Sequence, residues 1–287
     1  MDGSFFSLSS FSVSFFSMSL YWMMGYIITG IVSGFLAGLF GIGGGMIIVP
    51  ALIFYFQAVG FAENSTTQLA IGTSLATIIF TAMSSIRAHH NAGRVDYVWL
   101  KRSAPAMVIG ALISGFIAEK MSGIFLQILI GVLAFVIGFQ LLLNWTPRPQ
   151  NHPIHPARHF IIASCIGFAS GLFGIGGGSF SVPYLVFNRV AMQTAVGTSA
   201  ACGLPLAIAG TIGFIIGGWN VFGLPNATTG FVYWPAVLGI AIASVPAAQL
   251  GAFVAHRTSA KNLKRWFSFV LFVVGWQLLE PSISALF

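Results

Sequence analysis

Long apolar runs without charged residues recur along the whole chain. Many of them approach the length of about 20 residues that a helix needs to cross a bilayer. Of the 287 residues, 57% are hydrophobic and only 6% are charged. A water-soluble fold cannot bury so much apolar surface, so this composition excludes a soluble globular protein. The sequence predicts an all-α membrane protein that crosses the bilayer several times.

Glycine, proline and charged residues divide the apolar runs into ten segments. The second and seventh are short for a full crossing, so we expect discontinuous or re-entrant helices there. The segments lie at 22–40, 45–60, 68–86, 103–119, 124–145, 159–173, 178–190, 193–217, 231–255 and 266–287. A Ser/Phe-rich N-terminal lead-in, 1–21, precedes them without the basic region of a secretory signal.

The phrase "GLFGIGGG" occurs twice, at 38–45 and at 171–178. A proline follows each copy at the same distance, at Pro50 and Pro183, and "QLAIGTS" at 68–74 corresponds to "QTAVGTS" at 193–199. The chain is therefore a duplication. We expect a first transmembrane repeat at 22–145 and a second at 159–287, joined by a proline-rich cytoplasmic linker at 146–158.

Equivalent loops of the two repeats carry different charges, which predicts their relative orientation. Basic residues follow the third and the ninth segments: Arg87, Arg94, Lys101, Arg102, Arg257, Lys261, Lys264 and Arg265. The positive-inside rule places both clusters in the cytoplasm, although the two loops are not equivalent in the repeats. The halves are then inverted repeats of about five segments each. An arrangement with four crossings per half would make the repeats parallel, and it ranks second because it exports one basic loop.

Matched glycine breaks in an inverted repeat indicate the central site of a transporter. Glycine lets the backbone leave helical geometry and expose N–H groups at the start of the next helix, where an anion is favoured. The candidate binding glycines are Gly41, Gly43, Gly44 and Gly45 in the first copy, and Gly174, Gly176, Gly177 and Gly178 in the second. The alternative is that these glycines only permit close helix packing.

The second matched element offers neutral hydrogen-bonding groups for the same anion. Its members are Gln68, Gly72, Thr73 and Ser74 in the first half, and Gln193, Gly197, Thr198 and Ser199 in the second. Hydroxyls and amides placed symmetrically in apolar helices can surround an oxyanion without a fixed charge. Ser and Thr also bond back to their own helix or join two helices, and that alternative stays open.

Acidic residues are absent from the interior of every apolar segment. A cation or proton pathway commonly needs an intramembrane carboxylate, so the sequence favours an anion. Arg87, His89, His90 and Asn91, at the cytoplasmic end of the third segment, are candidates for an anion-attracting entrance. The alternative is that they are ordinary interfacial residues.

The sequence predicts no metal site and no cofactor. His152, His155 and His159 are interrupted by prolines and are interpreted as part of a solvated linker. Cys165 and Cys202 lie in apolar segments without a CxxC motif, which predicts buried free thiols. The basic residues lie in short clusters between apolar runs, so the net charge of +7 does not indicate nucleic-acid binding.

Taken together, these motifs resemble the sulfite exporter TauE/SafE family, also called the 4-toluene sulfonate uptake permeases. The likeness covers about 22–280 and rests on both glycine phrases, on "AIGTSLATIIFTAMSSIRAHHNAGRVDYVWLK" at 71–101, on "GLPLAIAGTIGFIIGGWN" at 203–220 and on "GAFVAHRTSAKNLKRWF" at 251–267. The resemblance implies a multi-pass transporter of the cell inner membrane. Its substrates would be sulfur-containing anions such as sulfite, sulfonates or sulfoacetate.

The leading hypothesis is thus a secondary transporter that works by alternating access. A passive anion channel and a membrane-embedded enzyme or assembly factor are the alternatives; the chain has no HExxH motif and no paired acids for catalysis. The expected partners are the small anion and the lipid bilayer, and a homodimer is left open. The direction of transport and its coupling to protons are not indicated by the sequence.

Overall fold

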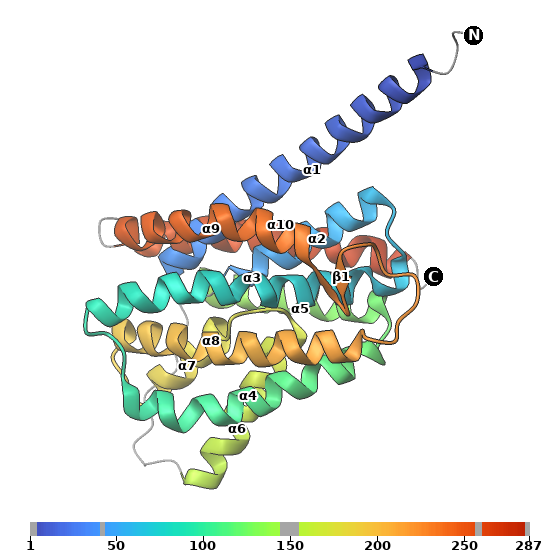
Figure 1. Cartoon of the computed structure of the whole chain (residues 1–287). Helices are drawn as coiled ribbons and strands as arrows, with labels where there is room; N and C mark the ends of the chain where they lie inside the picture. Colours follow the sequence, from blue (N-terminus) through green and yellow to red (C-terminus); the bar gives the residue numbers. More distant parts are fainter. Residues whose placement is uncertain (1–4, 41–43, 144–154, 256–259, 285–287) are drawn as a thin grey trace.

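The computed structural model describes residues 5–40, 44–143, 155–255 and 260–284. Within them the chain forms ten α-helices and one short antiparallel hairpin (Figure 1). The helices are α1 (Phe5–Phe40), α2 (Gly45–Val59), α3 (Glu63–Asn91), α4 (Tyr97–Glu119), α5 (Gly123–Leu142), α6 (Pro156–Leu172), α7 (Gly178–Phe187), α8 (Met192–Gly217), α9 (Trp234–Ala255) and α10 (Ala260–Ser284). The hairpin pairs β1 (Thr228–Thr229) with β2 (Val232–Tyr233) between α8 and α9.

The ten predicted apolar segments are confirmed as helices. Polar residues fix several of their starts: the Asp96 carboxylate accepts the N–H groups of Val98 and Trp99 at the beginning of α4, and the Ser122 hydroxyl accepts that of Phe125 in α5. Such side chains satisfy N–H groups that have no partner within the helix. α2 and α7 are the short helices, with 15 and 10 residues.

Two helices extend across boundaries drawn from the sequence, and the division into domains stays a prediction. α1 is continuous from Phe5 to Phe40, so the boundary drawn between 21 and 22 lies inside one helix. α6 begins at Pro156, inside the expected linker, and the imidazole of His155 caps its first turn. His152 lies outside the described residues. Proline at the first helical position lacks only an N–H that would be unpaired there, so it starts a helix readily.

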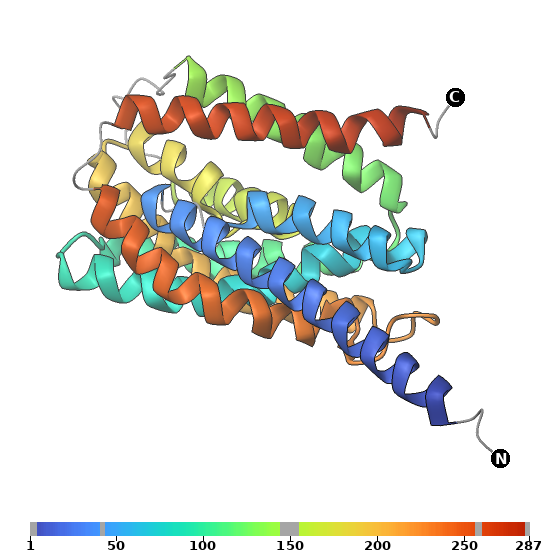
Figure 2. The same cartoon turned by 90° about the horizontal axis from the view of Figure 1, so that it is seen from above.

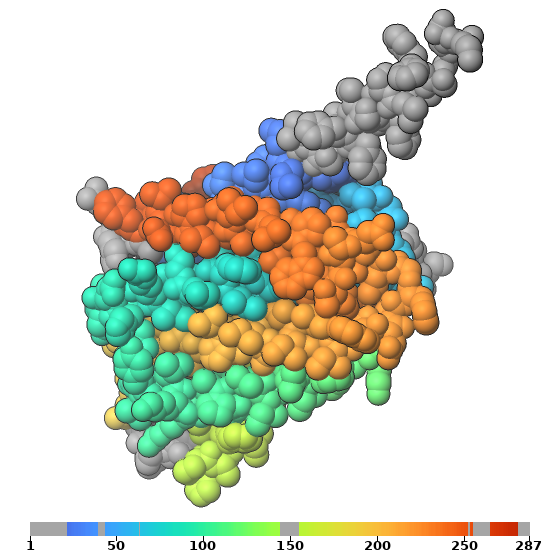
Figure 3. Space-filling view, in the orientation of Figure 1, coloured from blue at the N-terminus to red at the C-terminus, as the bar shows by residue number. Residues whose placement is uncertain are grey.

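Helices from the two halves alternate across the main layer of the molecule. α1 packs on α9, α9 on α3, α3 on α8, α8 on α4, and α4 on α6. Figure 3 shows α9, α3, α8, α4 and α6 following one another down one face. α5 and α10 pack on each other as a separate pair, at the top of the view in Figure 2.

Small residues allow this close packing. A Cβ added at Gly34 in α1 would overlap with the backbone of Ser244 in α9, and one added at Gly167 in α6 would overlap with that of Met107 in α4. Glycine lets two helix backbones approach each other directly, as membrane helix pairs often do.

The outer surface of the bundle is apolar, as lipid contact requires. Among the described residues, six helices are long and apolar enough to cross a membrane: parts of α1, α3 and α9, and all of α4, α5 and α8. Ile208, Ile212 and Ile216 lie every four residues along α8, and each is exposed. A soluble monomer rarely exposes apolar surface on this scale. Cys202 is buried and Cys165 is exposed on α6, so the prediction of two buried thiols is wrong for Cys165.

Charged residues separate to the two ends of the bundle. The turn between α3 and α4 and the start of α10 lie at one end, on the left of Figure 1, and the α4–α5 turn and the hairpin lie at the other. Arg87, Arg94, Lys101 and Arg102 belong to the first end, which we call the basic end. Glu119 and Lys120 belong to the opposite end.

Candidate functional site

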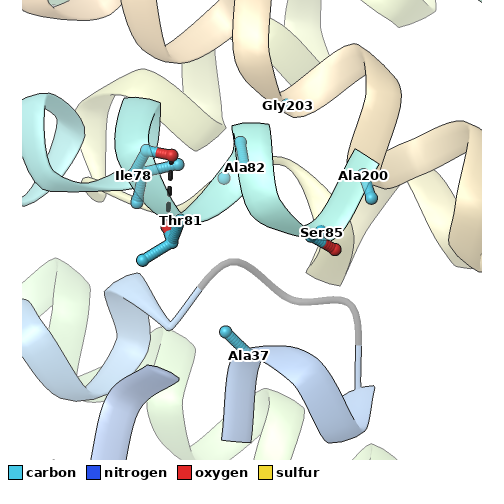
Figure 4. Close-up of a pocket in the computed structure, with 8 residues that line it drawn as sticks. Ala37, Ile78, Thr81, Ala82, Ser85, Ala200 and Gly203 are labelled. Carbon is cyan, nitrogen blue, oxygen red and sulfur yellow. Dashed lines mark hydrogen bonds between the residues drawn. The ribbon is translucent and has the colours of Figure 1, made fainter. Parts of the chain in front are cut away.

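A small cavity lies at the centre of the bundle, between α3 and α8 (Figure 4). α3 contributes Ile78, Thr81, Ala82 and Ser85, α8 contributes Ala200 and Gly203, and Ala37 and Gly176 complete the lining. Its volume is about 20 Å³, which is room for about one water molecule. None of these described lining residues carries a charge.

The glycine phrases provide the starts of the two short helices. Gly44 precedes α2 with φ 73°, and Gly177 precedes α7 with φ 83°. This left-handed conformation strains any residue that carries a Cβ, so glycine is required at both positions. No side chain caps either helix. Gly178, the first residue of α7, is buried, and Gly176 lines the cavity.

The two glycine phrases touch each other. A Cβ added at Gly45 would overlap with the carbonyl group of Gly174, which has a φ of 65°. The Ser74 hydroxyl donates to the Gly174 carbonyl oxygen over 2.9 Å, so the first-half GTS element holds the second-half glycine loop. Gly41 and Gly43 lie outside the described residues.

The second GTS element also reaches a glycine loop, but within its own half. The hydroxyls of Ser199 and Ser181 are in hydrogen-bond contact, and Ser181 donates to the Gly177 carbonyl oxygen over 2.8 Å. Both serines therefore stabilise the glycine loop of the second half: Ser74 bonds to it directly, and Ser199 does so through Ser181. The structure brings these serines together with Gly174 and Gly177 beside the cavity.

The Gly-Thr pairs hold the loops that lead into α4 and α9. The Thr73 hydroxyl oxygen accepts the N–H of Tyr233 over 3.0 Å, just before α9. The Thr198 hydroxyl oxygen accepts the N–H of Asp96 over 2.9 Å, just before α4. Both threonine oxygens thus accept a backbone N–H, a role that the sequence did not indicate.

The neighbouring glycines make the same loops fit. A Cβ at Gly72 would overlap with the Phe231 carbonyl oxygen, two residues before Tyr233. A Cβ at Gly197 would overlap with the Arg94 carbonyl oxygen, two residues before Asp96. Each Gly-Thr pair therefore contacts two backbone groups of the loop, and the arrangement is the same in both halves.

The structure does not bring the two glutamines to the cavity. Gln68 is buried, and its side-chain amide donates to the carbonyl oxygen of Met121 over 2.8 Å, at the α4–α5 turn. Its Oε1 atom is buried without a hydrogen-bond partner. Gln193 is exposed in the first turn of α8. The two glutamines occupy equivalent positions in the repeats, but one is buried and the other is exposed.

The expected entrance residues lie at the basic end of α3, within two turns beyond Ser85. Arg87, His90 and Asn91 are exposed, and His89 is half-buried. The Tyr97 hydroxyl lies 2.6 Å from Nδ1 of His90, which joins the end of α3 to the start of α4. Their exposure suits an entrance and an ordinary interface equally.

A stripe of hydroxyl groups on α3 was missed by the sequence interpretation. Thr73, Thr77, Thr81 and Ser85 follow one another at every fourth residue and therefore share one face of the helix. The stripe runs from the Gly-Thr pair to the cavity, where Thr81 and Ser85 form part of the lining. The four-residue spacing is visible in the sequence, but α8 has no matching stripe, so the internal repeat does not indicate it.

The described residues contain no group of three His, Cys, Asp or Glu side chains that could hold a metal ion. The described lining of the cavity consists of two hydroxyl side chains, two glycines and apolar side chains.

Comparison with known proteins gives the family. The model of the family described as "Sulfite exporter TauE/SafE" matches residues 26–278, nearly the whole chain. The chain belongs to the sulfite exporter TauE/SafE family. This family is a transporter family, and the six membrane-length helices make the protein a multi-pass membrane protein.

Curated relatives of the TauE/SafE chain carry names that agree with this membership. A "probable membrane transporter protein" of Haemophilus influenzae is 35% identical over 250 residues, covering 87% of this chain and 95% of the relative. One of Bacillus subtilis is 28% identical over 281 residues, covering 90% and 97%. One of Methanocaldococcus jannaschii is 30% identical over 264 residues, covering 88% and 94%. No solved structure matches the chain significantly.

Proposed function

We propose that the protein is a secondary transporter that moves a small sulfur-containing anion across the cytoplasmic (inner) membrane by alternating access. The observation that carries this proposal is the central cavity between α3 and α8, lined by hydroxyls and a glycine loop. The family description as sulfite exporters supports a sulfur oxyanion as the substrate class, which includes sulfite, sulfonates and sulfoacetate.

Alternating access requires two halves that move against each other, and an inverted repeat provides them. The packing order α1, α9, α3, α8, α4, α6 supports this arrangement, because exchanging each helix for its equivalent in the other half reproduces the order in reverse. The α3–α4 turn and its equivalent, the α8–α9 connection, lie at opposite ends of the bundle. Parallel repeats would place them at the same end.

The anion would be held by neutral groups. The hydroxyls of Thr81 and Ser85 border the cavity from α3. Gly176 lines it from the loop that starts α7, whose first N–H groups have no side-chain cap. A helix start favours negative charge, because its free N–H groups and its dipole both point toward the ligand. Gly44 and Gly45 would contribute in the same way through α2.

We infer that the described conformation is a closed form of the site. A cavity of about 20 Å³ holds one water molecule and not a sulfite ion with its three oxygens. Substrate entry therefore requires α3 and α8, or the loop with Gly176, to separate. The exposed Arg87 and His90 would attract the anion to the basic end of this path.

Counterflow in proteoliposomes tests the function. Vesicles loaded with unlabelled sulfite should accumulate radiolabelled sulfite transiently, and sulfonates added outside should compete. A passive channel gives downhill flux without this accumulation, and an enzyme releases a chemically changed label. Absence of exchange for sulfite, sulfoacetate, taurine and toluenesulfonate would reject the proposed substrate class.

Adjacent serines provide a matched pair of variants for the site. Ser85 lines the cavity, whereas the Ser84 hydroxyl faces α9 and donates to the Val245 carbonyl oxygen over 3.5 Å. A hydrogen bond to a charged partner contributes about 1.5–3 kcal/mol, so Ser85→Ala should weaken substrate affinity by roughly ten- to a hundredfold. Ser84→Ala should leave it unchanged. Equal affinities for both variants would place the substrate elsewhere.

A further inference from the structure

A buried histidine ties the α6–α7 hairpin to α4 at the basic end of the bundle. His159, in the first turn of α6, is 7% exposed. Its Nδ1 lies 2.7 Å from the Tyr184 hydroxyl of α7, and its Nε2 lies 3.3 Å from the Ser103 hydroxyl of α4. The prediction of a solvated linker residue is therefore wrong for His159.

Aromatic rings complete this cluster. The imidazole stacks on the ring of Tyr184 with centroids 5.7 Å apart, and Trp99 of α4 meets it edge-on at 5.3 Å. Asn188 donates from its side-chain amide to the Tyr184 carbonyl oxygen over 2.7 Å, which fixes the end of α7. The cluster closes the hairpin that carries the glycine loop of the central site.

A neutral imidazole suits this position well. It has one donor and one acceptor nitrogen, and a hydroxyl can take either role, so both contacts are satisfied without charge. A protonated ring would bring a buried positive charge, and its side-chain hydrogen-bond partners are two hydroxyls and no carboxylate. From α4 the ring is faced by Arg102, from α7 by Tyr184, and its own helix adds Arg158 and the capping His155. α8 has no Asp, Glu, Lys, Arg or His.

The electrostatics agree with this geometry. His159 lies outside the six membrane-length helices. Burial lowers its pKa from the ordinary value, a backbone hydrogen bond with Arg102 offsets part of this effect, and the charge of Arg102 lowers the pKa further. The closed form therefore favours the neutral imidazole. A fall in pH favours any form in which the ring is exposed to water, because the proton binds more readily there.

The equivalent position in the first half carries a different residue. Tyr26 lies 133 residues before His159, the same separation as the two glycine phrases. Tyr26 packs edge-on against Tyr55 of α2, with centroids 5.8 Å apart, so it joins α1 to α2 as His159 joins α6 to α7. Tyrosine does not gain a proton near neutral pH, but histidine does. A proton can thus act on one hairpin and not on the other.

We infer that His159 is a proton-binding site that releases the α6–α7 hairpin from α4 and opens the basic, cytoplasmic end of the transport path. The proton comes from the cytoplasmic water and binds to the ring nitrogen that accepts a hydrogen bond from a hydroxyl in the closed form, so that hydrogen bond is lost; no other covalent bond is made or broken. The inference rests on the proposed function and names the gate of the same site. A cytoplasmic fall in pH would then favour the form open to the cytoplasm.

The test measures opening without any substrate, so it is independent of the transport assay. Ser85→Cys, in a chain without the native thiols, reports access to the cavity by a membrane-impermeant thiol reagent added at the cytoplasmic face. The rate is divided by that of the exposed Asn91→Cys, which removes the pH dependence of the reagent itself. Each pKa unit that separates closed and open forms changes their ratio by up to about tenfold, so several-fold faster labelling is expected at about pH 5.5 than at about pH 8.

The His159→Gln variant should lose this pH dependence. The control His155→Asn removes an exposed imidazole from the same helix and keeps a good capping side chain, so it should behave like the parent. Ser103→Ala, which keeps the histidine and removes its side-chain hydrogen bond to α4, should raise labelling at about pH 8 and provides a second measurement if His159→Gln does not fold. An unchanged profile in His159→Gln or in Ser103→Ala overturns the inference.

Discussion

Replacing Gly72 with alanine should destabilise the protein by displacing the hairpin before α9. The new Cβ would overlap with the Phe231 carbonyl oxygen, and relief of the overlap requires a shift of about 1 Å. Phe231 is 2% exposed and Val232 is fully buried, so the loop has little room to move. The shift would also break the hydrogen bond from Tyr233 to Thr73.

The expected loss follows from these contacts. Overpacking in a tight interior costs about 1–3 kcal/mol, and a buried N–H left without an acceptor costs a similar amount. Alanine regains about 1 kcal/mol through its better helix propensity. The net loss is about 3 kcal/mol, which corresponds to a fall of roughly 6–12 °C in melting temperature by the scaling of soluble domains.

Thermal unfolding of the purified protein in detergent, followed by size-exclusion fluorescence, measures this fall. Gly197→Ala should lose less than Gly72→Ala, because the overlapped residue there, Arg94, is only half-buried. Gly210→Ala is the matched control in the interior of α8, since its nearest neighbour is the flexible end of Leu75 at 3.0 Å. The reasoning is refuted if Gly72→Ala melts with the parent and with Gly210→Ala.

Three further predictions concern other parts of the structure. Thr73→Val should lower stability by about 1–3 kcal/mol because the N–H of Tyr233 loses its acceptor, and Thr73→Ser should restore it; equal melting temperatures for the two variants would contradict this. Single cysteines at Arg94 and Lys261 should both be labelled from the cytoplasmic side alone, and labelling from opposite sides would restore the parallel arrangement. The lowered pKa of His159 means that the unfolded chain binds more protons, so its contribution to stability is complete above the ordinary pKa of about 6.5 and declines as the pH falls below it; melting temperatures across this range should show a smaller decline in His159→Gln.

The helices were predictable because membrane segments reveal themselves by local composition. A run of apolar residues in lipid is stable as a helix, because all its backbone groups are then paired. Gly44 and Gly177 fix where the short helices α2 and α7 begin. The duplication also pointed correctly to a pair of Gly-Thr elements in equivalent settings. Both properties depend on neighbours within the sequence or on its internal repeat.

The roles of individual side chains depended on partners far away in the chain. Thr73 and Thr198 carried the expected hydroxyls, but their acceptor oxygens face N–H groups of Tyr233 and Asp96. Ser85 was missed because it forms the cavity only where α3 crosses α8. Binding of an anion by the GTS elements stays a prediction.

The role of His159 also depends on partners that are distant in the sequence. The prolines and histidines that precede His159 are typical of a solvated linker. Nothing nearby in the sequence indicates that its side chain contacts Ser103 or Tyr184. Burial arose because α6 begins at Pro156, which turns His159 into a first-turn residue facing α4 and α7. A single sequence without its contacts cannot separate these two settings.

The alternation of helices from the two halves has a consequence for biosynthesis. α1 packs along α9, and α4 packs along α6 and α8, so helices of the first half find their main neighbours only after much of the second half has been made. Membrane helices are inserted in chain order. α1 is therefore in the bilayer without its main packing partner until α9 has been inserted beside it. Such non-local pairing slows folding and prolongs the exposure of unpaired surfaces. Each half therefore lacks the main packing partners of several of its own helices, and a chain truncated before α9 would leave α1 without the helix against which it mainly packs.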